Sequence, residues 1–92
     1  MNVAIHEKRR EIRQPAEGPV LVSFSDPQRM EILGDLMDLS PSGFRMAHAN
    51  QSLHSGQLVG FSHAFAMGTA RVMWNRIMDH RVETGFRIVT TR

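Results

Sequence analysis

From residue 19 onward, short stretches of apolar and β-branched residues alternate with breaks that contain glycine, proline, serine or asparagine. Short stretches of this kind between turn residues are typical of β-strands. The pattern predicts strands at Pro19–Phe24, Met30–Leu39, Phe44–Ala47, Gln57–Phe65, Thr69–Asn75 and Arg81–Val89. Turns or loops are expected between them, at 25–28, 40–43, 48–56, 66–68 and 76–80. Six short strands at close spacing favour an antiparallel barrel or sandwich. We expect a closed six-stranded antiparallel β-barrel, because a small open sheet would leave unpaired edges.

Alternation is clearest in the fifth expected strand, where apolar residues recur at every second position as Ala70, Val72 and Trp74. Successive side chains of a strand point to opposite faces of a sheet. We therefore expect Trp74 to share the core with Ala70 and Val72. The cations Arg71 and Arg87, on the last two expected strands, could line a ligand face, but a solvated face is the preferred assignment.

The first 18 residues differ in composition from the rest of the chain. Residues 7–14 are highly charged and carry almost no large apolar side chains, and Pro15, Gly18 and Pro19 follow them. A segment with so little apolar surface to bury does not order itself easily. The sequence therefore predicts a flexible N-terminal arm over residues 1–18, followed by one barrel domain over residues 19–92.

Composition excludes several classes of site. The 92 residues are 41% hydrophobic and 22% charged, an ordinary balance for one globular domain, and there is no cysteine to form a disulfide, a thiolate zinc site or a thiol nucleophile. The histidines at positions 6, 48, 54, 63 and 80 do not follow a zinc-binding spacing. No nucleophile-elbow motif is present. We expect no metal, no cofactor and no enzymatic activity.

The basic residues are almost all arginines. Lys8 is the only lysine among the 11 basic residues, and the formal net charge is only +2. A guanidinium suits bidentate contact with phosphate or guanine, but a nucleic-acid polymer would need a broader basic face and more aromatic side chains than the 7% present. No apolar stretch reaches the length of a membrane span or signal peptide. The expected location is the cytoplasm, without membrane insertion.

Two short motifs carry most of the functional information. Arg9 and Arg13 form an R-x-x-x-R pattern in the arm, and Asp38, Ser40 and Gly43 form D-x-S-x-x-G at the end of a predicted strand. Either motif alone has an ordinary structural explanation. Arginine-rich arms are commonly solvated, and D-x-S-x-x-G can form a turn in which glycine takes a positive φ.

Together, in this order and around a predicted barrel, the motifs resemble the PilZ domain family, whose members bind the bacterial second messenger cyclic di-GMP. The resemblance covers most of the chain. The similar segments are 7–13, 34–45, 53–59, 68–74 and 83–88. It implies a split barrel with the arm, and a ligand site made of Arg9, Arg10, Arg13, Asp38, Ser40 and Gly43.

The chemistry of these residues suits that ligand. Guanine presents O6 and N7 to an arginine fork, and its N1–H and N2–H donors can be accepted by a carboxylate, which assigns guanine recognition to Asp38. The arm arginines and the Ser40 hydroxyl are expected to bind phosphate. Gly43 is expected to permit the close backbone turn that presents Asp38 and Ser40.

The resemblance also implies a signalling mechanism. Ligand binding would order the arm and change the surface shown to a downstream protein partner, whose identity the sequence does not reveal. The alternative is a PilZ-like scaffold that acts through protein contacts without a nucleotide, although relatives of that kind typically lack the arginine pair. Little chain follows Val89 to form the C-terminal helix of many family members, so we expect a monomer or weak dimer.

Overall fold

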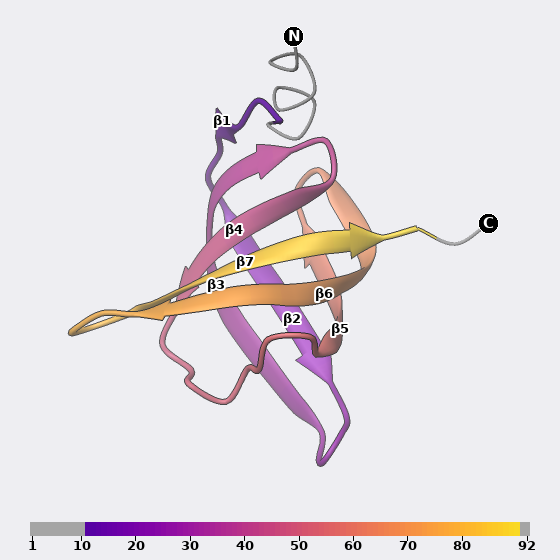
Figure 1. The fold of residues 1–92 in the computed structure, drawn as a ribbon, viewed down its shortest axis with the longest axis vertical. Helices are drawn as coiled ribbons and strands as arrows, with labels where there is room; N and C mark the ends of the chain where they lie inside the picture. The colour runs from indigo at the N-terminus through magenta and orange to yellow at the C-terminus, as the bar shows by residue number, and fades with distance from the viewer. Residues whose placement is uncertain (1–10, 91–92) are drawn as a thin grey trace, which may run out of the picture.

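The structure is a computed structural model that describes residues 11–90 (Figure 1). Within this range it is all-β, without a helix. The strands are β1 (Gln14–Pro15), β2 (Pro19–Phe24), β3 (Met30–Ser40), β4 (Gly43–His48), β5 (Leu58–His63), β6 (Ala66–Ile77) and β7 (Val82–Val89). Strands β2 to β7 form a closed six-stranded antiparallel barrel, and β1 is one extra strand. The expected fold class is confirmed.

The barrel closes through two long-range pairings. Hairpins join β2 to β3, β3 to β4, β5 to β6 and β6 to β7, while β2 pairs with β5 and β4 pairs with β7. The short strand β1 lies on the same side of β3 as β2, where Gln14 is opposite Leu39 and Pro15 is opposite Asp38. The chain just before β1 is thereby brought to the end of β3 that carries the D-x-S-x-x-G motif.

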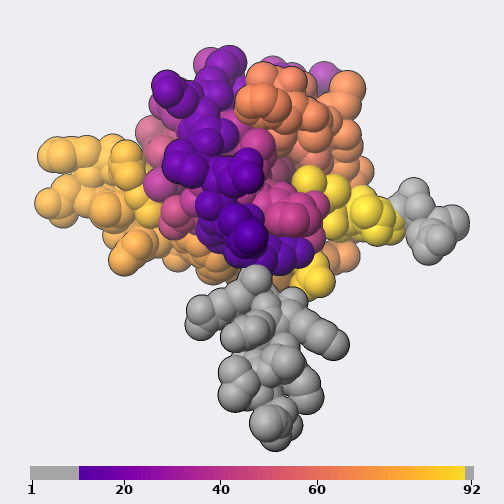
Figure 2. All heavy atoms as spheres, turned by 90° about the horizontal axis from the view of Figure 1, so that it is seen from above, coloured from indigo at the N-terminus to yellow at the C-terminus, as the bar shows by residue number. Residues whose placement is uncertain are grey.

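Residues 11–18, the described part of the expected arm, lie against the barrel. Besides the β1–β3 pairing, the amide of Ala16 donates to the carbonyl of Met37, and the amide of Leu36 donates to the carbonyl of Gly18. Figure 2 shows this indigo segment against the magenta part of the chain that includes the β3–β4 hairpin. The mobility expected of the arm and the boundary at residue 18 stay predictions.

One expected turn is wrong. The chain turns at Ala64 and Phe65, and β6 already begins at Ala66, so the expected turn at 66–68 lies within a strand. Gly68 is paired with Phe61 in the ladder between β5 and β6. A glycine can lie inside a paired strand, so its presence alone does not identify a turn.

The barrel interior is filled by apolar side chains from β2 to β7. Phe44 is its centre: its ring stacks on Phe86 at a centroid distance of 4.6 Å and lies 4.8 Å from Phe61. The core cluster also includes Val20, Val22, Ile32, Leu36, Met46, Leu53, Val59, Ala70 and Val72. Burial of such side chains is the main stabilising contribution to a small domain.

The alternation expected along β6 breaks at Met73. Val72 is opposite Phe86 and Trp74 is opposite Gly85, so Met73 is an extra residue in a β-bulge. A bulge of one residue shifts the following side chains to the other face of the strand. Trp74 is therefore 36% exposed, whereas Ala70 and Val72 are fully buried. The expectation that Trp74 shares their core is wrong.

The structure of residues 11–90 includes no helix that could cross a membrane.

Candidate functional site

The D-x-S-x-x-G motif forms the β3–β4 hairpin, in which Ser40 is paired with Gly43 and the loop consists of Pro41 and Ser42. The Ser40 hydroxyl donates to the carbonyl of Gly43 at 3.4 Å. Proline and serine in the loop suit a turn with negative φ angles, and positive φ occurs in the described chain only at Gly18, Gly56 and Gly68.

Gly43 is required for a reason other than backbone conformation. A Cβ at Gly43 would lie 2.1 Å from the carbonyl oxygen of Phe86 on the neighbouring strand. No atom can be accommodated at that distance without moving the backbone. The glycine therefore allows β4 and β7 to approach closely behind the hairpin turn.

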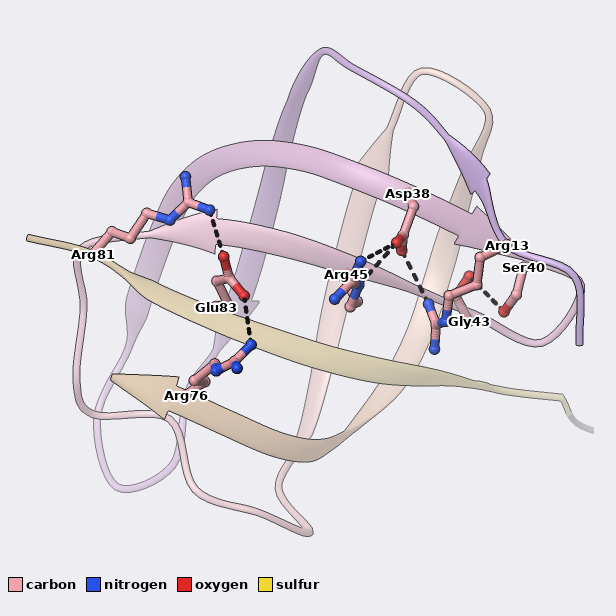
Figure 3. Close-up of polar contacts among 8 residues, drawn as sticks. All are labelled: Arg13, Asp38, Ser40, Gly43, Arg45, Arg76, Arg81 and Glu83. Carbon is pink, nitrogen blue, oxygen red and sulfur yellow. Dashed lines mark hydrogen bonds and ion pairs between the residues drawn. The ribbon is translucent and has the colours of Figure 1, made fainter. Parts of the chain in front are cut away.

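Asp38 is the buried centre of an ion-pair cluster. The hairpin register places it opposite Arg45, and its side chain is paired with two arginines (Figure 3). Oδ2 accepts hydrogen bonds from Arg45 Nε at 2.9 Å and from Arg45 Nη2, and Oδ1 accepts one from Arg13 Nη1 at 3.0 Å. Asp38 is only 6% exposed, and these ion pairs offset the cost of burying its carboxylate. The same hydrogen bonds raise the pKa of the Arg45 guanidinium.

Arg13 is paired with Asp38 but is still accessible to solvent. It immediately precedes β1, whose pairing with β3 brings it to Asp38. The hydrogen bond to Asp38 uses one of the five N–H donors of its guanidinium, and the side chain is 46% exposed. Asp38 therefore orients an arginine that can still bind an external anion.

A groove of about 730 Å³ lies beside the hairpin turn. Its size is within the roughly 300–1,000 Å³ of small-molecule sites. The groove is bounded by the segment before β1, the hairpin turn, and the facing parts of β6 and β7. Its lining residues are Glu11, Arg13, Ser40, Ser42, Gly43, Met73, Trp74, Gly85, Phe86 and Arg87.

The two walls from β6 and β7 contribute an aromatic ring and a second arginine. Trp74 lies against Gly85, where a Cβ would be 2.4 Å from the indole, so only glycine permits this position of the ring. Arg87 is opposite Gly43 and is exposed on the outer face of β7. The expectation of an exposed Arg87 is met, but the side chain also lines the groove. Arg71 instead donates to the carbonyl of Gly56.

Glu11 occupies part of the groove. Its Oε1 accepts hydrogen bonds from the Ser42 amide at 3.2 Å and the Ser42 hydroxyl at 2.7 Å. The bonds from Ser42, together with the nearby charge of Arg87, lower the pKa of the Glu11 carboxyl. Glu11 is therefore a carboxylate at neutral pH and balances part of the positive charge of the groove.

The structure brings together Arg13, Ser40 and Gly43 at the groove and places Asp38 behind them. Arg9 and Arg10 lie outside the described residues. Sequence reasoning gave no role in the site to four residues of this arrangement, Glu11, Ser42, Arg45 and Trp74, and it named Arg87 only as an alternative for the ligand face. Arg45 could have been found, because a hairpin that pairs Ser40 with Gly43 also places residue 38 opposite residue 45. The position of Trp74 depends on the bulge, which no local pattern indicated.

A second groove, also of about 730 Å³, lies at another part of the barrel. Its charged lining residues are Arg29, Asp26 and Glu31, so carboxylates outnumber arginines there. The reverse holds in the groove beside the hairpin, where Arg13 and Arg87 face Glu11. An anion is therefore better accommodated beside the hairpin.

Buried carboxylates elsewhere do not form a metal site. Glu83 is 5% exposed and is paired with Arg81 and, at 3.9 Å, with Arg76 (Figure 3). Across residues 11–90 no group of three histidine, cysteine, aspartate or glutamate side chains is arranged to hold a metal ion.

No model of a known protein family matches the chain, and no curated protein matches it. Its function must therefore be inferred from the chemistry of the residues around the groove.

Proposed function

We propose that this protein is a receptor for cyclic di-GMP and that the nucleotide binds in the groove beside the β3–β4 hairpin. One observation carries the proposal: Arg13, Arg87, the Ser40 and Ser42 hydroxyls and the Trp74 indole surround a single groove. They come from four separate parts of the chain. The sequence resemblance to PilZ domains, based on the motifs that contain Arg13 and Ser40, points to the same ligand.

The residues of the groove can bind both the phosphates and the guanines of the nucleotide. Cyclic di-GMP is a dianion with two guanines, so the phosphates need cations and hydrogen-bond donors, which Arg13, Arg87, Ser40 and Ser42 can supply. The fork of an arginine also fits O6 and N7 of guanine. The exposed indole of Trp74 offers a surface on which a base can stack, a contact worth about 1–3 kcal/mol.

Asp38 has a positioning role in this proposal. Both of its oxygens accept hydrogen bonds from arginines in the free protein. Direct acceptance of the guanine N1–H and N2–H by Asp38 would require Arg13 to leave Oδ1. The guanine contact expected of Asp38 therefore stays a prediction, and its support of Arg13 is the role that the geometry favours.

As a receptor for an intracellular messenger, the protein would act in the bacterial cytoplasm without a cofactor. Arg9 and Arg10 would add further cations from the arm. Closure of the arm over the ligand would then change the surface offered to a protein partner, with the receptor itself a monomer or weak dimer.

A nucleotide-independent scaffold is the alternative, and one observation favours it. Asp38 is fully engaged by Arg13 and Arg45, so part of the D-x-S-x-x-G motif also has a structural role. A scaffold would retain this ion-pair cluster and would not respond to the nucleotide.

Isothermal titration calorimetry with cyclic di-GMP tests the proposal directly. We expect saturable binding, and much weaker binding of cyclic di-AMP, because adenine has an amino donor where guanine has O6. Arg87→Ala should weaken binding, whereas Arg29→Ala, which removes the same charge at the other groove, should not. An absence of binding to the wild-type protein would refute the proposed function and favour the scaffold.

A further inference from the structure

The contact between Glu11 and Ser42 joins two residues that the sequence motifs leave unassigned. Glu11 is an intervening position of R-x-x-x-R, and Ser42 is an intervening position of D-x-S-x-x-G. In the structure the backbone N–H and the hydroxyl of Ser42 converge on the same oxygen, Oε1 of Glu11, at 3.2 and 2.7 Å. The contact lies in the groove beside the hairpin.

Both Ser42 donors are directed at a charged oxygen, Oε1 of Glu11. An N–H and an O–H that point at one oxygen form stronger hydrogen bonds when that oxygen is charged. Arg87 is close by, because its strand position is opposite Gly43, and its charge contributes to the lowered pKa of Glu11. These donors therefore already stabilise a negative charge in the free protein.

The turn that presents these donors is anchored on both sides. The amide of Ile88 on β7 donates to the carbonyl of Ser42 at 2.7 Å, and the Ser40 hydroxyl donates to the carbonyl of Gly43. Glu11, in contrast, belongs to the segment before β1 and is fully exposed. The Ser42 donors can therefore keep their positions while the Glu11 side chain leaves for water.

We propose that the Ser42 N–H and Oγ–H form a subsite for a phosphate oxygen, and that Glu11 fills this subsite in the free protein. The identity of the ligand rests on the proposed function: in cyclic di-GMP the oxygen belongs to a phosphodiester. The Glu11 carboxylate and the phosphate cannot accept the same two hydrogen bonds, and their like charges repel. Ligand binding therefore requires displacement of Glu11, which lowers the apparent affinity by the fraction of protein with the subsite open.

Glu11 is two residues before Arg13, so the subsite opens next to the arginine that Asp38 orients. The subsite thus links occupancy of the groove to the position of the N-terminal segment.

The first test compares cyclic di-GMP affinities by calorimetry for wild type, Glu11→Ala and Glu17→Ala. Glu17 is an exposed carboxylate on the same segment, so its removal changes the net charge equally without opening the subsite. We expect Glu11→Ala to bind about three- to tenfold more tightly than wild type and Glu17→Ala to bind within about twofold of it. Equal or weaker binding by Glu11→Ala overturns the competition.

The second test does not need the nucleotide. Inorganic phosphate is titrated into ¹⁵N-labelled wild type and Glu11→Ala, and the amide resonance of Ser42 is followed by NMR. We expect this resonance to shift in Glu11→Ala at a lower phosphate concentration than in wild type. If cyclic di-GMP binds neither protein but the resonance shifts as expected, the proposed function fails and the subsite stands as a phosphate site. If the resonance does not respond in Glu11→Ala, the subsite is wrong even if the nucleotide binds.

Discussion

Arg13 and Asp38, 25 residues apart in the sequence, form an ion pair with an N···O distance of 3.0 Å. It joins the segment before β1 to the strand that carries the D-x-S-x-x-G motif. The two motifs recognised in the sequence are therefore in direct contact without any ligand. Asp38 also holds Arg45, so the carboxylate supports the hairpin as well as the groove.

Asp38→Ala should affect both stability and binding. Its removal leaves two arginines without their partner, but both are partly exposed and can be hydrated, so we expect the free energy of unfolding to fall by only about 1–2 kcal/mol in urea denaturation. Cyclic di-GMP binding should weaken by about 1–3 kcal/mol in calorimetry. A variant with lowered stability and wild-type affinity would show that Asp38 acts only on the fold.

Trp74→Ala should weaken binding without unfolding the barrel. The indole is exposed and lies on the outer face against Gly85, so its truncation removes a stacking surface and leaves the core intact. We expect an affinity loss of about 1–3 kcal/mol. Phe65→Ala, which removes an exposed aromatic ring that is not part of the groove lining, is the matched control and should retain the wild-type affinity. In wild type, the fluorescence of the single tryptophan should change on titration with cyclic di-GMP. An unchanged affinity of Trp74→Ala would remove the aromatic wall from the site.

Gly43→Ala should destabilise the barrel itself. The new methyl group would meet the carbonyl oxygen of Phe86 at 2.1 Å, and this neighbour is backbone that cannot rotate away. We expect a loss of about 2–4 kcal/mol in the free energy of unfolding, the cost of overpacking with a backbone shift. Gly60→Ala is the control, because its Cβ would lie 3.3 Å from the flexible hydroxyl of Ser23. Thermal unfolding of both variants measures the difference, and equal midpoints would contradict the role assigned to Gly43.

Stability should decrease in mild acid because of His48. Its Nδ1 accepts a hydrogen bond from the Asn50 amide at 3.1 Å, and its Nε2 is 2.7 Å from the hydroxyl of Thr84, which donates to Asn75. Burial lowers the pKa of His48 below its ordinary value of 6.5. The unfolded chain therefore binds more protons than the folded protein once the pH falls below about 6.5. The stability that neutral His48 provides is complete above that pH and is lost as the pH falls further.

Urea denaturation at pH 7.5, 6.5 and 5.5 measures this effect. Burial lowers the pKa of His63 as well, so both histidines contribute to the decrease. His48→Gln should reduce the dependence on pH, whereas His54→Gln, which changes an exposed histidine, should leave it as in wild type. A free energy of unfolding that is constant from pH 7.5 to 5.5 would rule out the linkage.

Much of the fold followed from local patterns. The strand expected at Pro19–Phe24 agrees with β2 at both ends, and the break at Ser40–Gly43 became the β3–β4 hairpin. These features depend on residues close in sequence, whose alternation and turn propensities are visible without knowledge of the distant contacts. The short motifs also indicated which parts of the chain carry polar chemistry, including the Arg13 and Asp38 that the structure joins.

Only the tertiary structure decided how that chemistry is arranged. Trp74 faces outward because β6 has a bulge at Met73 when it pairs with β7, and no local pattern predicts which residue a bulge accommodates. Arg87 reaches the hairpin turn because barrel closure pairs β7 with β4, and the β1–β3 pairing brings Glu11 to Ser42 from 31 residues away. The sequence by itself determined the six barrel strands to within a few residues, and the residue types available for binding, but it did not indicate β1. The side of the barrel on which each residue lies depended on strand register, which is set by the pairing of distant strands.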